Sequence, residues 1–284
     1  MLHILTEQEL SDLKQTLLNM YIDIQQVCQK YGISIMLGGG SALGAMRHKG
    51  FIPWDDDMDA MMSRNDYERF KTLCAQGVFG DKYEFTYPNK CNDSKNLFMK
   101  IYQKGSECIE ISDVGTPFPK GIFIDIFPID NVPANRLLCV MKGFVSNLMS
   151  YVSVSVLYYQ YRNSLFKRYS ESIGQGKVYK LRLVIGWLGS FMNHKTWAYL
   201  FDRFVTSSSD NGRVTIPTGR KLYLGEIVDR DVMFPARKVI FEGVEVFVPN
   251  KVESYLSNLY GDYMVIPPPH KRERHSVVSL VIKR

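Results

Sequence analysis

Residues 38–59 read GGGSALGAMRHKGFIPWDDDMD. Three glycines and a serine follow a short apolar run, and four aspartates fill all but one of the last five positions. A glycine turn at a helix start brings backbone N–H groups close to an anion, which the helix dipole also favours. The pattern therefore predicts that Gly39, Gly40 and Ser41 cradle a phosphate. Three glycines alone fit a simple tight turn equally well.

The aspartates at the end of this stretch indicate a divalent-cation site. Side chains two apart on a strand share a face, so Asp57 and Asp59 can reach one ion, with Asp55 joining them. Mg²⁺ is usually held by one or two carboxylates, waters and substrate phosphates, and Mn²⁺ is an alternative. A solvated acidic loop is the other interpretation. The upstream glycines and the apolar residues at 51–54 weaken that second interpretation.

Hydrophobic periodicity around this stretch predicts a mixed α/β protein. Thr6 and Glu9 form a capping-box pattern before a long amphipathic helix. Asn250, after a predicted hairpin, is expected to cap another helix. The expected strands are 33–37, 57–62, 97–103, 107–111, 121–127, 239–241 and 244–248, and further helices are expected at 42–46, from Ser63 through residue 73, within 140–200, and at 251–260.

Composition places the chain among ordinary globular proteins and constrains its surroundings. Its 284 residues are 45% hydrophobic and 23% charged. The five cysteines form no CxxC pair or Cys/His cluster, so they suggest neither a zinc site nor a disulfide scaffold. The N-terminus lacks the basic and apolar regions of a secretion signal. These features predict a cytoplasmic protein.

The net charge of +6 is concentrated in one part of the chain. Between Arg136 and Arg203 there are ten basic residues and two acids, a balance of +8, which leaves −2 for the remainder. A concentrated basic region indicates an anionic partner, such as a membrane surface or a polyanionic acceptor. No nucleic-acid-binding motif accompanies it, so nucleic acid is not expected as a partner.

The basic region is also helical and apolar, and it has two interpretations. Serines interrupt the stretch from Gly143 to Tyr161, which makes it more polar than an ordinary membrane span. One interpretation is an insertion whose residues 140–200 lie on the inner face of the plasma membrane. The other is a helical subdomain with a buried seam. We expect a single domain over 1–284, with 140–214 as the inserted segment.

Basic and aromatic residues flank the acids on both sides in the sequence. Arg47 and His48 can contact phosphate, or be ordinary loop residues. Lys271 and Arg272 can close over a nucleotide together with Arg274 and His275, or form a basic tail. The aromatic side chains of Trp54, Tyr260 and Tyr263 can form a cage for a quaternary ammonium, but buried aromatics more often belong to the core.

The stretch at 38–59 resembles the signature of LicD-type phosphotransferases, to which the fukutin relatives also belong. Further blocks that resemble this family are 123–128, 241–243, 255–256, 260–264, 267–268 and 271–272. The resemblance implies a nucleotidyltransferase-like fold, with a mixed sheet flanked by helices. It also implies transfer of a phospho-alcohol from a CDP-alcohol donor, typically phosphocholine from CDP-choline, to a cell-surface glycan or its glycolipid precursor. Residues 140–214 carry no matching motif.

The resemblance also implies roles for individual residues. Asp57 and Asp59 are expected to bind the metal, with Asp55 assisting. Asp125, on a neighbouring strand, is expected to complete the acidic cluster and to orient or deprotonate the acceptor hydroxyl as CMP leaves. Positioning and charge neutralisation supply most of the catalysis in phosphoryl transfer, so little covalent participation by the protein is needed. A structural, backbone-paired Asp125 is the alternative.

Three rival functions use the same residues differently. A true nucleotidyltransferase would move a nucleoside monophosphate to a small hydroxyl compound with the same acids. A non-catalytic membrane-binding module would act through the basic segment alone. A glycosyltransferase with a DxD motif is a weaker alternative, because it does not call for a glycine turn at this spacing. A phosphoribitol or phosphoglycerol transferase is a variant of the main hypothesis.

Overall fold

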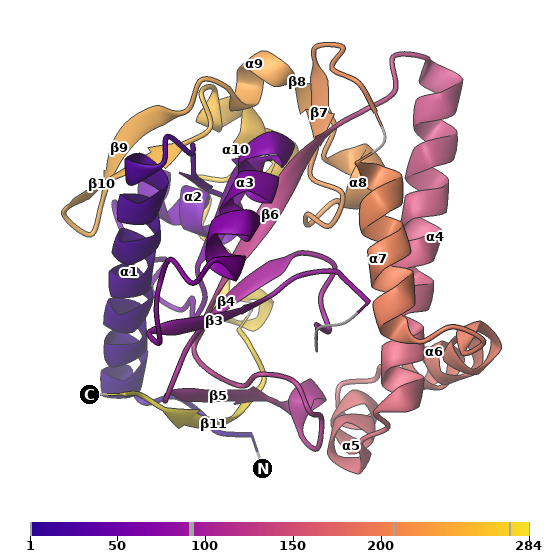
Figure 1. Ribbon diagram of the computed structural model, residues 1–284. Coiled ribbons are helices and arrows are strands. Elements are labelled where there is room, and N and C mark those ends of the chain that lie inside the picture. Colours follow the sequence, from indigo (N-terminus) through magenta and orange to yellow (C-terminus); the bar gives the residue numbers. More distant parts are fainter. Residues whose placement is uncertain (1, 91–93, 207, 273, 284) are drawn as a thin grey trace.

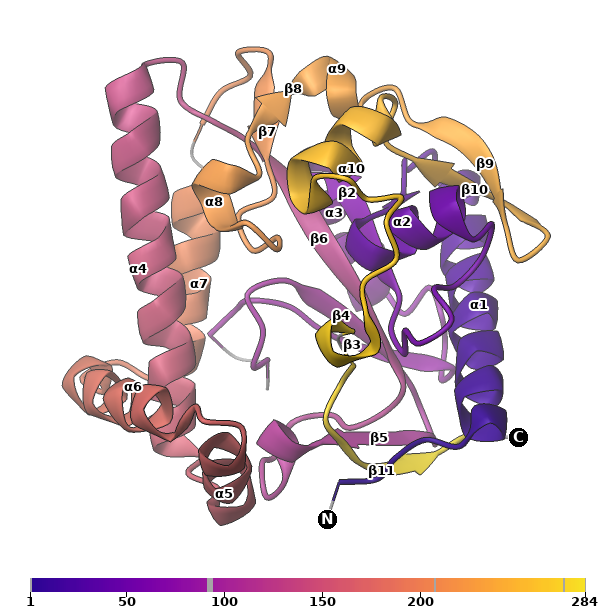
Figure 2. The same cartoon turned by 180° about the vertical axis from the view of Figure 1, so that it is seen from behind.

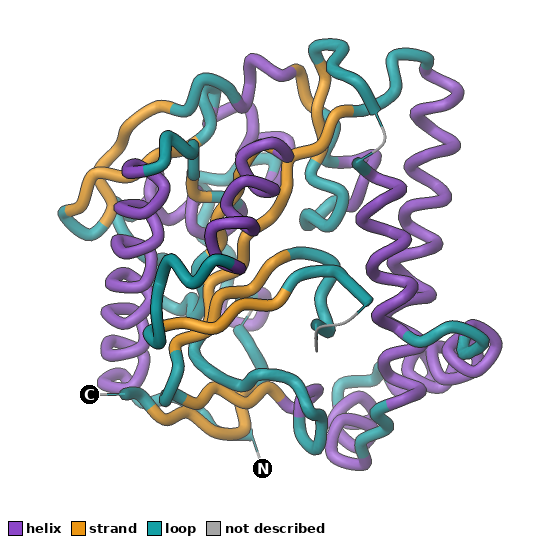
Figure 3. The backbone as a smooth tube through the Cα atoms, viewed as in Figure 1, coloured by secondary structure: helices purple, strands orange, loops and turns teal. Residues whose placement is uncertain are grey.

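The computed structural model describes residues 2–90, 94–206, 208–272 and 274–283, so Cys91 lies outside it. Figure 1 shows the elements in sequence order, and Figure 3 separates helices from strands. The helices are α1 Glu7–Lys30, α2 Gly39–Arg47, α3 Arg64–Ala75, α4 Arg136–Gln160, α5 Ser164–Ser172, α6 Gly176–Gly189, α7 His194–Val205, α8 Leu222–Gly225, α9 Arg230–Met233 and α10 Val252–Tyr260, with 3-10 turns η1 Ile111–Asp113 and η2 Pro269–Lys271. The strands are β1 Met36–Leu37, β2 Asp59–Ser63, β3 Tyr83–Thr86, β4 Met99–Gln103, β5 Glu107–Glu110, β6 Phe123–Asn131, β7 Arg213–Thr215, β8 Val228–Asp229, β9 Arg237–Phe241, β10 Val244–Val248 and β11 Val277–Val281.

The central sheet is mixed, which confirms the expected α/β class. Its strand order is β1-β2-β6-β4-β3, and β7 and β8 extend the far end of β6. Strands β2 and β6 run parallel, whereas β6 and β4 run antiparallel. The long strand β6 therefore has β2 on one side and β4 on the other. Two small antiparallel pairs, β9 with β10 and β5 with β11, lie beside this sheet.

Alternation along β6 divides the strand between the core and the site. Ile122, Ile124 and Ile126 are at most 1% exposed, whereas Phe123 and Asp125 are partly exposed. Side chains on a strand alternate between its two faces, so the isoleucines fill the core on one face while Asp125 projects from the other. The predicted alternation is confirmed. Because of this alternation, the Asp125 carboxyl lies on the face opposite the isoleucines and is not buried among them.

Helix α1 covers one edge of the molecule, as the sequence predicts. Thr6 accepts a hydrogen bond from the backbone N–H of Glu9, and the Glu9 carboxylate accepts one from the backbone N–H of Thr6. This reciprocal pair satisfies two N–H groups at the start of the helix. Ser63 caps α3 with its hydroxyl alone, which accepts from the N–H of Asp66. The predicted β9–β10 hairpin is also present.

Helices α4 to α7 form a second layer beside the sheet (Figures 1 and 2). Helix α4 packs against α6, α7 and α8. A separate apolar cluster lies between these helices and the end of β6, and it includes Val132, Phe201 and Tyr223, each at most 1% exposed. The segment that carries the basic charge is therefore helical and joined to the sheet through its own core.

Three local predictions differ from the structure. Strand β1 covers only residues 36–37, and β2 begins at Asp59, so Asp57 precedes the strand instead of sharing it. The glycines are not a turn before the helix, because α2 starts at Gly39 with Gly38 as its N-cap. Asn250 is not a helix cap, because its side-chain amide donates to the carbonyl of Asp231 and Lys251 occupies the N-cap position of α10.

Candidate active site

Three charged side chains lie in a row across the middle of the sheet. Asp59 on β2 is the register partner of Asp125 on β6, and Asp125 is in turn the partner of Lys100 on β4. Residues paired in register project from the same face, with strands about 4.8 Å apart. The Nζ of Lys100 lies 3.0 Å from Oδ1 of Asp125. Parallel pairing of β2 with β6 thus brings together acids that are far apart in the sequence.

Asp59 and Asp125 line a cavity of about 590 Å³, within the usual size range of small-molecule sites, whereas the buried Lys100 is not among its lining residues. The cavity brings together most of the residues singled out from the sequence. Ser41 and His48 do not line it. The predicted residues that do line it are Gly39, Gly40, Arg47, Asp55, Asp57, Asp59, Asp125, Lys271 and Arg272.

Ser41 and His48 have other roles in the structure. Ser41 is buried, and its hydroxyl accepts a hydrogen bond of 2.9 Å from the backbone N–H of Asp59. It therefore fixes the start of β2 against α2. The His48 ring meets Trp54 edge-on at 6.2 Å and lies 3.4 Å from Nε of Arg47. Neither residue lines the cavity, and their contact with phosphate stays a prediction.

The N-terminus of α2 faces the acids at close range. A β-carbon added to Gly39 would lie 2.8 Å from Oδ2 of Asp59, and one added to Gly40 would lie 3.0 Å from Oδ2 of Asp55. Glycine at these positions keeps the space between helix and carboxylates open. The backbone N–H of Gly39 donates to the hydroxyl of Tyr255 on α10, 3.1 Å away. The N–H of Gly39 is thus already hydrogen-bonded within the protein. The predicted phosphate cradle is therefore limited to the N–H groups of the residues after Gly39.

Burial and mutual repulsion raise the pKa values of the clustered carboxyls. Burial, followed by the charges of Asp57 and Asp56, raises the pKa of Asp55 to about 8. Burial, followed by the charges of Asp57, Asp125 and Asp55, holds the pKa of Asp59 well above its usual range. Like charges at close range disfavour ionisation of one another. The site consequently favours either protons or an external cation.

The acids fit a cation that keeps part of its hydration shell. Among residues 2–90, 94–206, 208–272 and 274–283, no three acidic, imidazole or thiol groups converge tightly enough to enclose a metal by themselves. Mg²⁺ rarely needs such a cage, because one or two carboxylates with waters and substrate phosphates suffice. The crowded carboxylates and the open space above Gly39 and Gly40 meet that requirement. Asp57 and Asp59, on either side of the buried Met58, both line this space.

Lys100 is a site residue that sequence reasoning missed. Burial opposes its charge, but the carboxylates of Asp125 and Glu110 outweigh that effect and raise its pKa. Its ammonium also lies 3.3 Å from the centroid of the Phe123 ring. A cationic Lys100 keeps one positive charge permanently beside Asp125. The only indication in the sequence was a lysine among mostly apolar residues of a predicted strand. Such a pattern does not show that Asp125 is the partner of Lys100.

His275 ties the C-terminal segment to the acids. Its Nδ1 lies 3.0 Å from Oδ1 of Asp56, and its Nε2 lies 3.4 Å from Glu110 and 3.9 Å from Asp57. Burial lowers the pKa of this imidazole, but the hydrogen bond with Asp56 and the charges of Asp57 and Glu110 prevail and raise it to about 10. The protonated ring therefore offsets part of the negative charge of the cluster.

We call residues 262–272 and 274–275 the basic strap. Eight of them line the cavity wall: Asp262, Tyr263, Val265, Pro267, Lys271, Arg272, Arg274 and His275. Arg47 donates to the carbonyl of Tyr263 at 2.7 Å, so it holds the strap in place. Arg274 donates to the carbonyl of Trp54 at 2.9 Å. The interpretation of 271–275 as a free basic tail is therefore wrong.

The aromatic side chains do not form an open cage. The Arg272 guanidinium lies 4.2 Å from the centroid of the Trp54 ring, and that of Arg220 lies 5.3 Å from the centroid of Tyr260. These ring faces already carry cations from the protein itself. Trp54 and Tyr260 thus position arginines around the cavity, and the structure does not offer them together as an ammonium-binding cage.

A methyl group at Gly39 is expected to inactivate the site. Gly39 has a φ of +46°, which residues other than glycine rarely adopt, and its added β-carbon would meet the Asp59 carboxylate. We expect Gly39→Ala to lower turnover at least about 100-fold, as displacements of about 1 Å at a reacting centre can do. Steady-state kinetics of the purified variant measures the effect.

Gly77→Ala is the matched control for this strain. Gly77 has a φ of +78°, but an added β-carbon meets nothing within 4 Å. Both variants are expected to lose roughly 1–3 kcal/mol of stability from backbone strain. Only Gly39→Ala should lose activity. Equal activity of the two variants would show that the gap between α2 and Asp59 is not needed.

Glu226 gives the protein a measurable pH dependence. It is 2% exposed at one end of the cavity, and burial raises the pKa of its carboxyl from 4.5 to about 7, even though it accepts a hydrogen bond from the N–H of Lys221. Because its pKa is higher in the folded state, folded protein resists its ionisation, and stability falls as the pH rises from about 4.5 to 7. A shift of this size corresponds to about 3 kcal/mol.

Glu226→Gln is expected to remove this loss. Urea unfolding at pH 5 and at pH 8 measures it, and the gain of the variant over the wild type should be small at pH 5 and about 3 kcal/mol at pH 8. Glutamine keeps an oxygen that can accept from Lys221, so the local structure is preserved. A gain that is the same at both pH values would contradict the assignment.

The acids, the start of α2 and the mixed sheet together form a candidate active site in an α/β domain. Residues 32–136 match the family described as LicD/FKTN/FKRP, nucleotidyltransferase domain. The chain is also similar to the lipopolysaccharide cholinephosphotransferase LicD of Haemophilus influenzae. The two are 28% identical over 269 residues, which cover 93% of this chain and 95% of that protein.

Proposed function

We propose that this protein transfers phosphocholine from CDP-choline to a hydroxyl of a cell-surface glycan or its lipid-linked precursor, and releases CMP. The observation that carries the proposal is the row of Asp59 and Asp125 across β2 and β6, facing the start of α2 inside the cavity. It lies within residues 32–136, which match the LicD/FKTN/FKRP family. The similar protein from Haemophilus influenzae, which is named as a cholinephosphotransferase acting on lipopolysaccharide, supports the choice of alcohol and acceptor.

The donor diphosphate would lie between the acids and the basic strap. Asp57 and Asp59, with help from Asp55, would hold Mg²⁺ or Mn²⁺, which would neutralise the phosphate charge. Lys271 and Arg272 line the same cavity and can contact phosphate oxygens. These residues hold the donor with the reacting phosphorus exposed to attack.

Asp125 would receive the proton of the acceptor hydroxyl. Burial raises the pKa of its carboxyl, which strengthens it as a base, and the charge of Lys100 offsets part of that rise. The Lys100 ammonium, 3.0 Å from Asp125, also provides positive charge close to the reacting centre. Asp125 therefore orients the attacking oxygen, and the bond to the CMP oxygen breaks as the bond to the acceptor oxygen forms.

The proposal is tested by following nucleotide products. Purified protein, Mg²⁺ and a deacylated surface glycan are incubated with CDP-choline, CDP-ribitol, CDP-glycerol or nucleoside triphosphates, and products are resolved by chromatography and mass spectrometry. CMP release with a gain of phosphocholine on the glycan is the expected result. Transfer only from CDP-ribitol or CDP-glycerol would keep the chemistry and change the alcohol. Pyrophosphate released from a triphosphate would instead support a nucleotidyltransferase.

A further inference from the structure

A broad apolar surface remains uncovered on the helical layer. Twelve side chains of α4 and α6, and Phe191 just after α6, are at least 37% exposed although they are large and hydrophobic. They are Leu137, Leu138, Val140, Met141, Phe144, Val145 and Leu148 on α4, and Val178, Leu181, Val184, Trp187, Leu188 and Phe191 on or just after α6, with Trp187 and Leu188 as close neighbours. Exposed apolar groups gathered in this way mark an interaction surface. We call them the outer face.

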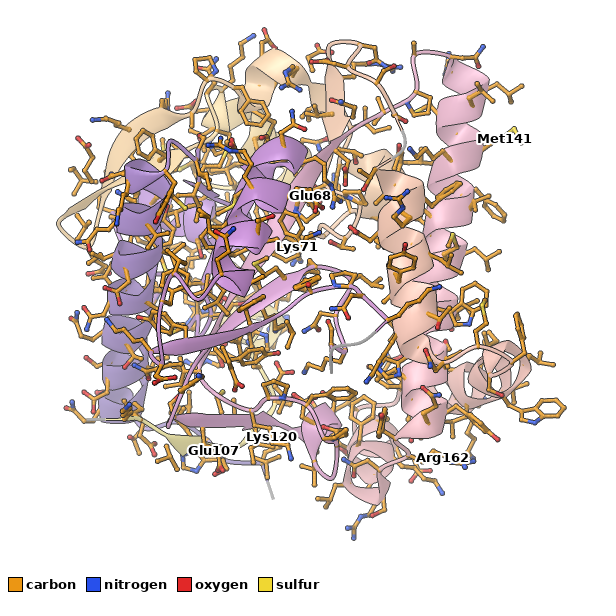
Figure 4. The ribbon with its side chains drawn as sticks, in the orientation of Figure 1. Glu68, Lys71, Glu107, Lys120, Met141 and Arg162 are labelled. Atoms are coloured by element: carbon orange, nitrogen blue, oxygen red, sulfur yellow. The ribbon has the colours of Figure 1, made fainter. Side chains whose placement is uncertain are left out.

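Helical spacing places the members of the outer face in one strip on each helix. On α4, Leu137, Met141, Phe144 and Leu148 repeat every three or four residues. In both views the two helices form one margin of the molecule, on the side away from α1 (Figures 1 and 2). Met141 projects outward from α4 (Figure 4). The outer face is therefore exposed to solvent along the side of the molecule away from α1.

The opposite sides of α4 and α6 pack against the rest of the protein. The Nζ of Lys142 donates to the carbonyl of Val205 at 2.9 Å, and Ser146 and Ser155 are fully buried. A β-carbon on Gly186 of α6 would lie 2.1 Å from the carbonyl oxygen of Ser155, so α4 and α6 are in close contact there. Helix α4 is long and apolar enough to cross a membrane by composition. These contacts would be lost if it did so.

The charges around the outer face are mostly positive, with the exposed Glu171 of α5 as an exception. Helices α4 and α6 contain no aspartate or glutamate, whereas Arg136, Lys177 and Lys180 are exposed on them. Arg162 and Arg168, between the two helices in sequence, are also exposed, and Arg162 lies at the lower end of α4 (Figure 4). Apolar side chains surrounded by lysine and arginine complement an interface with an anionic headgroup layer.

We propose that the outer face docks on the surface of an anionic phospholipid bilayer, with α4 and α6 lying in the headgroup region and not spanning it. The surface also continues toward the cavity. Leu224 of α8 is 39% exposed, and a β-carbon on Gly143 of α4 would lie 2.4 Å from it. The loop just before α8 contributes Gly219 and Arg220 to the cavity wall. Docking would thus bring the cavity close to acceptors anchored in lipid. The inference does not depend on the proposed reaction.

Vesicle flotation tests this docking without any activity measurement. The full chain is mixed with vesicles of phosphatidylcholine alone or of phosphatidylcholine with phosphatidylglycerol. We expect binding to the anionic vesicles that weakens with salt. Trp187 is 60% exposed, so its fluorescence should shift to the blue and be quenched by brominated lipid on binding. No binding to the anionic vesicles would overturn the proposal.

Surface variants locate the contact. Trp187→Ser with Leu188→Ser should lower partitioning at least about tenfold, because both side chains would lie in the apolar boundary. Lys180→Glu should lower it about tenfold, because a charge that attracts is replaced by one that repels. The matched controls are Ile240→Ser with Val281→Ser, both 53% exposed elsewhere, and Lys30→Glu on α1. These controls should bind as the wild type does.

Two results would assign the outer face to another occupant and overturn the proposal. The first is a stable dimer in sedimentation without lipid that the Trp187→Ser/Leu188→Ser variant dissociates, since a second copy would then cover the surface. The second is resistance of the bound protein to alkaline carbonate extraction, since α4 would then span the bilayer. Folding of each variant is checked by circular dichroism and thermal unfolding.

Discussion

Replacing Asp59 with asparagine is expected to abolish metal-dependent activity and to stabilise the metal-free protein at the same time. The carboxyl is buried, and its pKa is held high by burial and by three neighbouring aspartates. The asparagine side chain would occupy nearly the same space without the charge, so repulsion in the cluster falls. With Asp59 as a proposed metal ligand, its replacement is expected to remove several kcal/mol of transition-state stabilisation, which corresponds to a decrease in rate of about 1,000-fold or more.

Thermal unfolding with EDTA and with Mg²⁺ separates the two effects. In EDTA, each kcal/mol gained by Asp59→Asn should raise the Tm by about 2–4 °C for a chain of this size. Saturating Mg²⁺ should raise the Tm of the wild type and leave that of the variant nearly unchanged, because only the wild type binds it well. A variant that is less stable than the wild type in EDTA would contradict the picture of a repulsive acidic cluster.

Asp81→Asn is the control for the change of side chain. Asp81 is fully exposed and makes one long contact of 3.6 Å with Lys104. Its replacement alters the same chemical group at a solvated position, where ion pairs contribute little. Neither the Tm in EDTA nor the response to Mg²⁺ should change. A similar response of both variants would mean that the effect follows from net charge and not from the cluster.

Sequence patterns correctly predicted the features of the fold that depend on residues close together in the chain. The capping box of Thr6 and Glu9, the alternation along β6 and the β9–β10 hairpin are all set by residues close together in sequence. The start of α2 was predicted too late. Glycines favour turns on average, but here Gly38 serves as the N-cap and the hydroxyl of Tyr255, more than 200 residues away, accepts from Gly39. Tertiary contact overrode local preference.

The candidate site was predictable in part, for a similar reason. The aspartates at 55–59 are adjacent in sequence, so their convergence needs little more than a bend. Asp125 was placed with them by resemblance to a family, and the parallel register of β2 and β6 puts it beside Asp59. Register between distant strands is set by the packing of whole faces, which a local pattern does not contain. Lys100 was missed because its role depends on the register of β4 against β6.

The strap shows the same limit at the other end of the chain. Lys271 and Arg272 were recognised only as basic residues near the C-terminus, with two interpretations left open. Their place on the cavity wall depends on Arg47, which donates to the carbonyl of Tyr263, and on His275, which pairs with Asp56. Each of these contacts joins residues more than 200 positions apart. Charge in the sequence indicated an anionic ligand, but only the tertiary structure shows that these residues line the cavity, and their contact with a nucleotide stays a prediction.

Replacing Arg64 with methionine is expected to cause the largest loss of stability among the substitutions considered. Its guanidinium holds Asp130 through two hydrogen bonds of 2.7 Å and Asp202 through one of 2.8 Å. The Asp130 side chain is only 1% exposed and that of Asp202 is 12% exposed. Removing one partner from a buried ion pair leaves an uncompensated charge and typically costs about 3–5 kcal/mol.

This network joins the helical layer to the sheet. Arg64 begins α3, Asp130 lies on β6 and Asp202 lies on α7, so its loss should loosen α7 and the attached α4. Urea unfolding of Arg64→Met measures the total cost. Arg69→Met is the control, because the Arg69 side chain is 55% exposed and its pair with Asp66 should contribute less than about 1 kcal/mol.

A triple replacement distinguishes the network's two possible contributions. If the cost of Arg64→Met comes from unpaired buried carboxylates, then Arg64→Met with Asp130→Leu and Asp202→Leu should recover most of it, because apolar groups of similar volume need no partner. If the triple variant is instead as unstable as Arg64→Met, the hydrogen-bond geometry itself holds α7 against β6. If the triple variant recovers the stability, the ion network selects the arrangement of the layers more than it stabilises them. Vesicle binding by the outer face should then survive in the triple variant and decline in Arg64→Met.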